Sequence, residues 1–94
     1  MLRIDIAKRV EKFQARLPAK HRRQIAARII DLANDPNAQD TKALQGADFR
    51  RADSGEYRIA YRIAHRVTGQ ALQIVLVGKR NDDEVYRQLK RLGR

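Results

Sequence analysis

Cysteine and tryptophan are absent from this chain of 94 residues. Without cysteine the protein can form no disulfide, no thiolate metal site and no cysteine nucleophile. A small domain without disulfides fits a reducing cytoplasm better than secretion, so we expect a cytoplasmic protein. Aromatic residues are scarce, with three Tyr and two Phe, and the core must therefore be built mainly from Ile, Leu and Val.

Long hydrophobic runs are also missing. No segment approaches the roughly 20 apolar residues that a membrane-spanning helix requires. Charges at Arg3, Asp5 and Lys8 interrupt the N-terminus, so we expect no signal peptide there. The chain contains no repeat, low-complexity tract or linker-like stretch, and we predict one soluble domain over residues 1–94 that has no membrane partner.

Negative charge is scarce as well, because 11 Asp and Glu oppose 21 Lys and Arg, for a formal net charge of +10. This imbalance favours a polyanionic partner, either nucleic acid or an acidic protein segment. The alternative is a highly charged surface that serves only solubility. We favour the polyanion because the excess of positive charge is larger than solubility requires.

The N-terminal half has the pattern of a strand followed by a helical hairpin. Residues 2–6 alternate apolar and charged, as in a short strand. A helix is predicted over about residues 7–16 and a second over about residues 19–33, with a break at Pro18 between them. Their apolar stripes are Ile6, Val10, Phe13 and Leu17 in the first, and Ile25, Ile29 and Leu32 in the second. Turn formers end the hairpin, and residues 37–45 are predicted to be irregular.

The C-terminal half changes to a period of two, which predicts strands. These are expected over residues 49–53, 57–64 and 71–77, and the last is so apolar that both of its faces should be covered. A final helix is predicted over about residues 83–92, capped by Asp82 or Asp83. The expected order β-α-α-β-β-β-α describes an α+β domain in which a helical hairpin packs on an antiparallel sheet.

Several short motifs occur in a recognisable order. They are the run Gly55-Glu56-Tyr57-Arg58-Ile59-Ala60-Tyr61-Arg62-Ile63, an apolar strand, Gly78-Lys79-Arg80, and Val85-Tyr86. In this order and spacing the chain resembles the RelE family of bacterial toxins, in the RelE/ParE superfamily of type II toxin–antitoxin systems. The likeness extends to Phe13, Leu17-Pro18 and Leu44-Gln45-Gly46, and so covers nearly the whole chain.

The resemblance implies an activity and a set of partners. Members of this family are mRNA interferases that cut messenger RNA in the ribosomal A site and so inhibit translation. They are endoribonucleases that require no metal and no cofactor. A cognate antitoxin, RelB-like in this case, holds them inactive. The implied partners are therefore this antitoxin, the ribosome and mRNA.

The resemblance also implies site residues. Carried over by motif, the catalytic residues are Arg58, Arg80 and Tyr86. A basic position on the preceding strand falls on Arg50 or Arg51, of which Arg51 is assigned to catalysis and Arg50 to RNA binding. Where well-studied members have a second lysine, this chain has Ala52 or Asp53. The other cations that we assign to RNA binding are Lys79, Arg62, Arg22 and Arg23.

Cleavage of RNA needs a proton taken from the 2′-hydroxyl, charge stabilised on the phosphorane, and a proton given to the leaving 5′-oxygen. We expect neither His21 nor His65 to do this work, because neither lies in the motif. Arginine can present several fixed N–H donors to a phosphate, and Tyr86 can stack on a base or exchange a proton. Such a site should be slow on free RNA unless the ribosome holds the message in an in-line geometry.

Two other functions remain open from the sequence. The ParE branch of the same superfamily keeps the fold but acts on DNA gyrase, so a gyrase inhibitor is one alternative. The combination of Arg58, Arg80 and Tyr86 favours the nuclease, since a gyrase inhibitor does not need it. The other alternative is a non-catalytic basic protein that binds RNA or the ribosome as a regulator.

Overall fold

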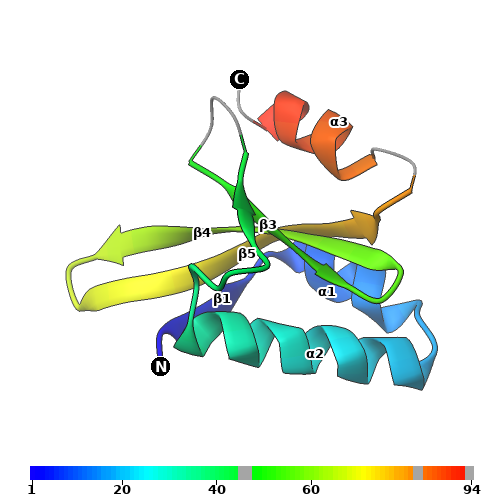
Figure 1. Cartoon of the computed structure of the whole chain (residues 1–94), viewed down its shortest axis with the longest axis horizontal. Helices are drawn as coiled ribbons and strands as arrows, with labels where there is room; N and C mark the ends of the chain where they lie inside the picture. The colour runs from blue at the N-terminus through cyan, green and yellow to red at the C-terminus, as the bar shows by residue number, and fades with distance from the viewer. Residues whose placement is uncertain (45–47, 82–83, 93–94) are drawn as a thin grey trace.

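A computed structural model describes residues 1–44, 48–81 and 84–92. Its elements follow the predicted order, with one addition (Figure 1). They are β1 (Arg3–Ile6), α1 (Lys8–Ala15), α2 (Ala19–Asn34), β2 (Lys42–Ala43), β3 (Arg50–Ser54), β4 (Tyr57–Arg66), β5 (Gly69–Lys79) and α3 (Glu84–Leu92). The addition is β2, which lies in the segment predicted to be irregular and pairs with β3. The predicted caps Asp82 and Asp83 lie outside the described residues.

The five strands form one sheet in the order β1-β5-β4-β3-β2. Strands β2 to β5 pair antiparallel, as predicted, whereas β1 runs parallel to β5. The sheet is therefore mixed and not wholly antiparallel. The direction of β1 could not be read locally, because an alternating pattern is the same for a parallel and an antiparallel partner.

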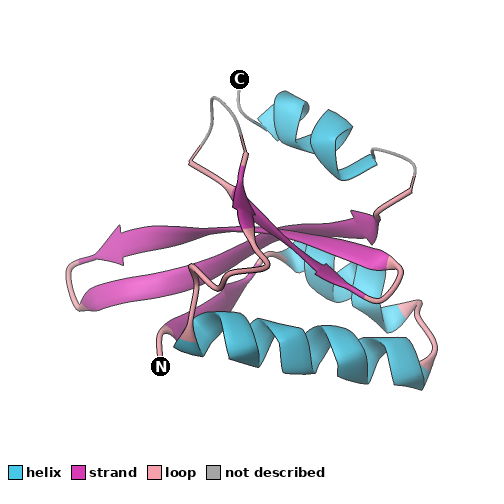
Figure 2. Cartoon of the chain, in the orientation of Figure 1, coloured by secondary structure: helices cyan, strands magenta, loops and turns pink. Residues whose placement is uncertain are grey.

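Helices cover both faces of the sheet, as Figure 2 shows, with α1 and α2 on one side and α3 on the other. On the hairpin side, Ile25 and Leu32 pack with Ile59 and Leu72 in the larger core cluster. On the α3 side, a smaller cluster gathers Ala60, Val75, Leu76, Val85 and Leu89. The prediction that β5 is covered on both faces is confirmed. Ile6, predicted to join the stripe of the first helix, lies on β1 and is 37% exposed.

A β-bulge lies in the middle of β5. Ala60 pairs with Leu76 while Tyr61 pairs with Ile74, so Val75 is an extra residue in the ladder. Because a bulge shifts the alternation of side chains by one residue, Val75 and Leu76 both belong to the cluster beneath α3. The bulge thus gives α3 a wider apolar surface on which to pack against the sheet.

Among the described residues, no helix is both long enough and apolar enough to cross a bilayer.

Candidate active site

The site is built on the turn between β3 and β4. Gly55 adopts φ 58°, a left-handed conformation that glycine reaches without strain. The turn pairs Ser54 with Tyr57 and Asp53 with Arg58. Residues directly opposite one another in an antiparallel pair share a face of the sheet and lie close. The turn therefore sets a carboxylate against a guanidinium group.

Asp53 and Arg58 form a two-point ion pair. Nε of Arg58 donates to Oδ1 of Asp53 at 2.8 Å, and Nη2 donates to Oδ2 at 3.3 Å. The Arg58 side chain is 15% exposed, so its guanidinium group is largely withdrawn from solvent. These hydrogen bonds hold the pKa of the Asp53 carboxyl below its usual value, against the opposing effect of burial. They also raise the pKa of Arg58, and the pair is fully charged at neutral pH.

Tyr86 joins the pair from α3. Nη1 of Arg58 donates a 2.8 Å hydrogen bond to the phenol oxygen of Tyr86, and the guanidinium carbon lies 5.4 Å from the ring centroid. Burial of Val85 and Leu89 against the sheet fixes α3, and with it the direction of Tyr86. Because the phenol oxygen accepts from Arg58, its own O–H remains directed elsewhere and is available to donate.

Two more cations approach the same carboxylate. Nη1 of Arg80 lies 3.8 Å from Oδ2 of Asp53, and Nη1 of Arg51 lies 3.9 Å from it. The backbone N–H of Arg80 donates to the carbonyl oxygen of Glu56 at 3.0 Å, which fastens the end of β5 to the β3–β4 turn. The predicted catalytic residues Arg51, Arg58, Arg80 and Tyr86 thus lie together around Asp53. We call these five residues the Asp53 cluster.

Asp53 was not predicted as a functional residue; it was noted only as a departure from a lysine position. Its signal was present in the sequence, because a two-residue turn at Gly55-Glu56 makes Asp53 the partner of Arg58. Of the alternatives Arg50 and Arg51, only Arg51 reaches the cluster. Arg50 donates instead to Oγ1 of Thr41 at 2.9 Å and is paired with Tyr61 in the sheet, so it lies on the hairpin side.

The remaining predicted RNA-binding residues lie outside the Asp53 cluster. Arg62 is on β4, where Nε donates to Oε1 of Gln73 at 2.6 Å and the guanidinium stacks 5.4 Å from the ring centroid of Phe49. Lys79 is exposed at the end of β5. On α2, Arg22 donates to the carbonyl oxygen of Leu17 at 3.1 Å, and Arg23 is exposed. These cations are spread over the surface instead of converging.

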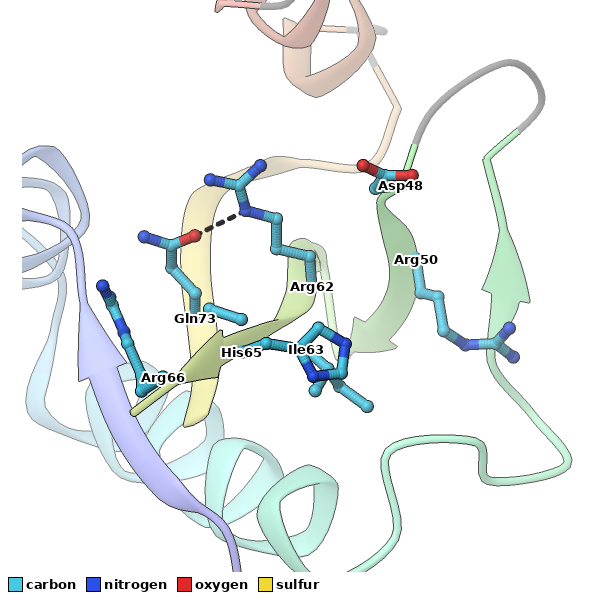
Figure 3. Close-up of a pocket in the computed structure, with 8 residues that line it drawn as sticks. Asp48, Arg50, Arg62, Ile63, His65, Arg66 and Gln73 are labelled. Carbon is cyan, nitrogen blue, oxygen red and sulfur yellow. Dashed lines mark hydrogen bonds between the residues drawn. The ribbon is translucent and has the colours of Figure 1, made fainter. Parts of the chain in front are cut away.

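Arg62 borders a basic cavity of about 640 Å³ at the far end of β4 (Figure 3). Arg50, His65, Arg66 and Asp48 also line it. Figure 3 shows the guanidinium of Arg50 directed away from Arg62. His65 lies here, and His21 bonds to the hydroxyl of Tyr57 at 2.8 Å on the hairpin side. Neither histidine therefore belongs to the Asp53 cluster.

Comparison with known proteins gives a consistent family and fold. A family model described as the ParE toxin of the type II toxin-antitoxin system, parDE, matches residues 3–84. A doubly substituted E. coli toxin RelE in the free state has a TM-score of 0.76 at 21% identity, over 97% of this chain and 97% of that chain. No curated protein sequence matches significantly.

Two further solved structures contain an antitoxin. The archaeal RelE–RelB complex from Pyrococcus horikoshii OT3 has a TM-score of 0.71 at 26% identity, over 86% of this chain and 97% of that chain. The intact E. coli RelBE toxin–antitoxin complex has a TM-score of 0.69 at 20% identity, over 84% of this chain and 96% of that chain. The fold of this chain is therefore RelE-like.

Proposed function

Because the chain belongs to the family of ParE toxins of type II toxin–antitoxin systems, in the RelE/ParE superfamily, we propose that it is a ribosome-dependent mRNA interferase. It cuts messenger RNA as a metal-independent endoribonuclease in the cytoplasm and so inhibits translation. One observation carries the proposal: Arg58 contacts Tyr86 directly, and Arg51 and Arg80 approach the carboxylate that Arg58 binds.

The chemistry follows from the donors in the Asp53 cluster. The 2′-oxygen of one nucleotide attacks its 3′-phosphorus while the bond from phosphorus to the 5′-oxygen breaks, which leaves a 2′,3′-cyclic phosphate. Arg58 and Arg80 stabilise the negative charge that develops on the phosphorane. The proton of the 2′-hydroxyl passes to a solvent water, and Arg51 and Arg80 favour this ionisation by stabilising the alkoxide. Tyr86 gives its proton to the leaving 5′-oxygen, since its phenol oxygen already accepts from Arg58.

Dependence on the ribosome follows from what the Asp53 cluster contains. It has no histidine, so proton transfer is weakly catalysed and the reaction relies on the substrate being held in line. Cations outside the cluster, Arg22 and Arg23 on α2 and Lys79, Arg62 and Arg50 on the sheet, are proposed to contact ribosomal and messenger RNA phosphates.

The proposed inhibitor is a RelB-like antitoxin, supported by the toxin–antitoxin complexes among the similar structures. A groove of about 510 Å³ is lined by α1 on one face of the sheet, by the C-terminal end of β5, and by α3 on the other face, and its apolar floor includes Phe13 and Val77. Its rim carries Arg9, Lys12, Arg16 and Lys79 against one carboxylate, Glu84. An amphipathic acidic segment of the antitoxin fits this combination of apolar floor and basic rim.

A DNA gyrase inhibitor is the second candidate, because the matching family model carries the ParE name. Induction of the protein followed by mapping of mRNA 5′ ends separates the two. Cuts that keep a constant phase within codons and vanish when initiation is blocked support the interferase. DNA breaks without mRNA cuts support the gyrase inhibitor. The absence of both mRNA cuts and DNA breaks supports a non-catalytic binder. Arg58→Ala serves as the inactive control, and Arg3→Ala, at an exposed arginine of β1 outside the proposed RNA contacts, as a control for charge.

A further inference from the structure

The carboxylate of Asp53 occupies the centre of the cationic cluster. Oδ2 lies 3.3 Å from Nη2 of Arg58, 3.8 Å from Nη1 of Arg80 and 3.9 Å from Nη1 of Arg51. Three guanidinium groups from β3, β4 and the segment after β5 thus converge on one oxygen atom. Convergent arginines of this kind are suited to an anion with several oxygens, such as a phosphodiester.

The Asp53 carboxylate and a substrate phosphate therefore compete for the same donors. Arg58 donates hydrogen bonds from two of its N–H groups to Asp53 and from a third to Tyr86. Each donor that holds the carboxylate must be released, or shared, before it can hold a phosphate. A fixed negative charge at this distance also repels the incoming phosphate. The side chain of Asp53 is 33% exposed, so the contact can open toward solvent without unpacking the core.

We propose that Asp53 is an internal substitute for the scissile phosphate, which closes the anion site of the free toxin and must be displaced when RNA binds. This inference rests on the proposed ribonuclease function and adds a regulatory contact to its site. The carboxylate holds the guanidinium groups in a phosphate-binding arrangement and keeps their affinity for free RNA low. The ribosome presents the message at high local concentration, which allows the RNA phosphate to displace the carboxylate although its affinity as a free strand is low.

The competing interpretation is that Asp53 only positions Arg58. The two interpretations predict opposite changes in anion affinity. If Asp53 competes with phosphate, its neutral isostere Asn should bind anions more tightly. If Asp53 only positions Arg58, the same substitution should weaken binding. Asp40 gives a matched control, because it forms an equally short 2.8 Å pair with Arg28 away from the cluster.

The test is binding of a three-nucleotide RNA in which the 2′-oxygens of the first two nucleotides are replaced by hydrogen, so that neither linkage can be cut. We expect Asp53→Asn to bind it about tenfold tighter than the native toxin at low salt, as removal of one repelling charge a few ångströms away predicts. Asp40→Asn, which changes the net charge equally, should differ from the native toxin by less than about twofold. Weaker or unchanged binding by Asp53→Asn, relative to Asp40→Asn, overturns the inference.

A second measurement uses the native chain and so does not depend on how a variant folds. The Nε–H resonance of Arg58 reports its bond to Asp53 in an NMR titration with the same RNA. A large shift of this resonance as RNA binds supports displacement of the carboxylate, and an unmoved resonance at saturation overturns it. Because both measurements score binding, a toxin that binds as expected but cuts no message would contradict the proposed function alone.

Discussion

Arg58 donates a 2.8 Å hydrogen bond to the phenol oxygen of Tyr86, a residue 28 positions later in the chain. The bond joins the centre of the sheet to the last helix. It also orients both groups, because the guanidinium stacks on the ring whose oxygen it contacts. This contact predicts which atoms take part in cleavage and which only hold the reacting groups in place.

Removal of the Tyr86 hydroxyl should slow cleavage while leaving the fold intact. In Tyr86→Phe the ring still packs against Arg58, but the donor proposed for the 5′-oxygen is lost. We expect single-turnover cleavage of ribosome-bound mRNA to fall by about 10²-fold or more, the usual contribution of a general acid. Tyr57→Phe is the matched control, since it removes a hydroxyl that bonds to His21 on the opposite side of the sheet. It should cost stability and leave the cleavage rate near that of the native toxin.

Replacement of Arg58 by lysine tests geometry apart from charge. Lysine keeps the positive charge but cannot hold Asp53 at two points and reach Tyr86 at once. We expect Arg58→Lys to reduce cleavage by about 10²-fold, the loss typical of one transition-state donor. Arg62→Lys, four residues along the same strand, should reduce it far less, because Arg62 contacts Gln73 and Phe49 instead of the Asp53 cluster. Equal losses in the two variants would contradict the assigned site, as would antitoxin binding lost in parallel with activity.

The Asp53–Arg58 pair should make stability depend on pH in the acid range. The pKa of Asp53 is lowered in the folded protein, chiefly by its hydrogen bonds from Arg58. A lowered pKa stabilises the fold above the unfolded value of about 3.9, and this stabilisation is lost as pH falls through the folded pKa. The native toxin should therefore exceed Asp53→Asn in free energy of unfolding at pH 6, and the gap should close below about pH 4. Urea unfolding at both pH values measures the gap, and a constant gap would refute the expectation.

Gly78 limits how closely α3 can approach the sheet. A Cβ at this position would lie 3.0 Å from Cγ2 of Val85, and the residue pairs with Arg58 across the ladder. We expect Gly78→Ala to push α3 outward, separate Tyr86 from Arg58 and lower the cleavage rate. Val85→Ala removes the obstructing methyl groups, at the cost of a small cavity.

The double variant Gly78→Ala with Val85→Ala gives the control. If the clash is the cause, the double variant should cleave faster than Gly78→Ala alone, so the two substitutions are not additive. Additive losses in a double-mutant cycle would show that Gly78 acts through something other than its contact with Val85.

Local patterns were sufficient for most elements of the fold. The stripe of Ile25, Ile29 and Leu32 gave the second helix, and all three residues are buried in the core. The apolar run of β5 correctly indicated a strand covered on both faces. These signals can be read from the sequence because buried residues recur with the period of the helix or strand that carries them. The bulge at Val75 and the parallel pairing of β1 depend on partners distant in sequence, and no local period records them.

The sequence alone determined which kinds of side chain this protein can bring to a polyanion: many guanidinium groups, a phenol near the end of the chain, and no cysteine. Only the tertiary structure decided that Arg51, and not Arg50, approaches the carboxylate of Asp53, since adjacent residues of a strand point to opposite sides of the sheet. It also decided that Asp53 sits at the centre of the cations. The side chains of Asp53 and these cations can meet only after the turn geometry, the strand register and the position of α3 on the sheet are all fixed.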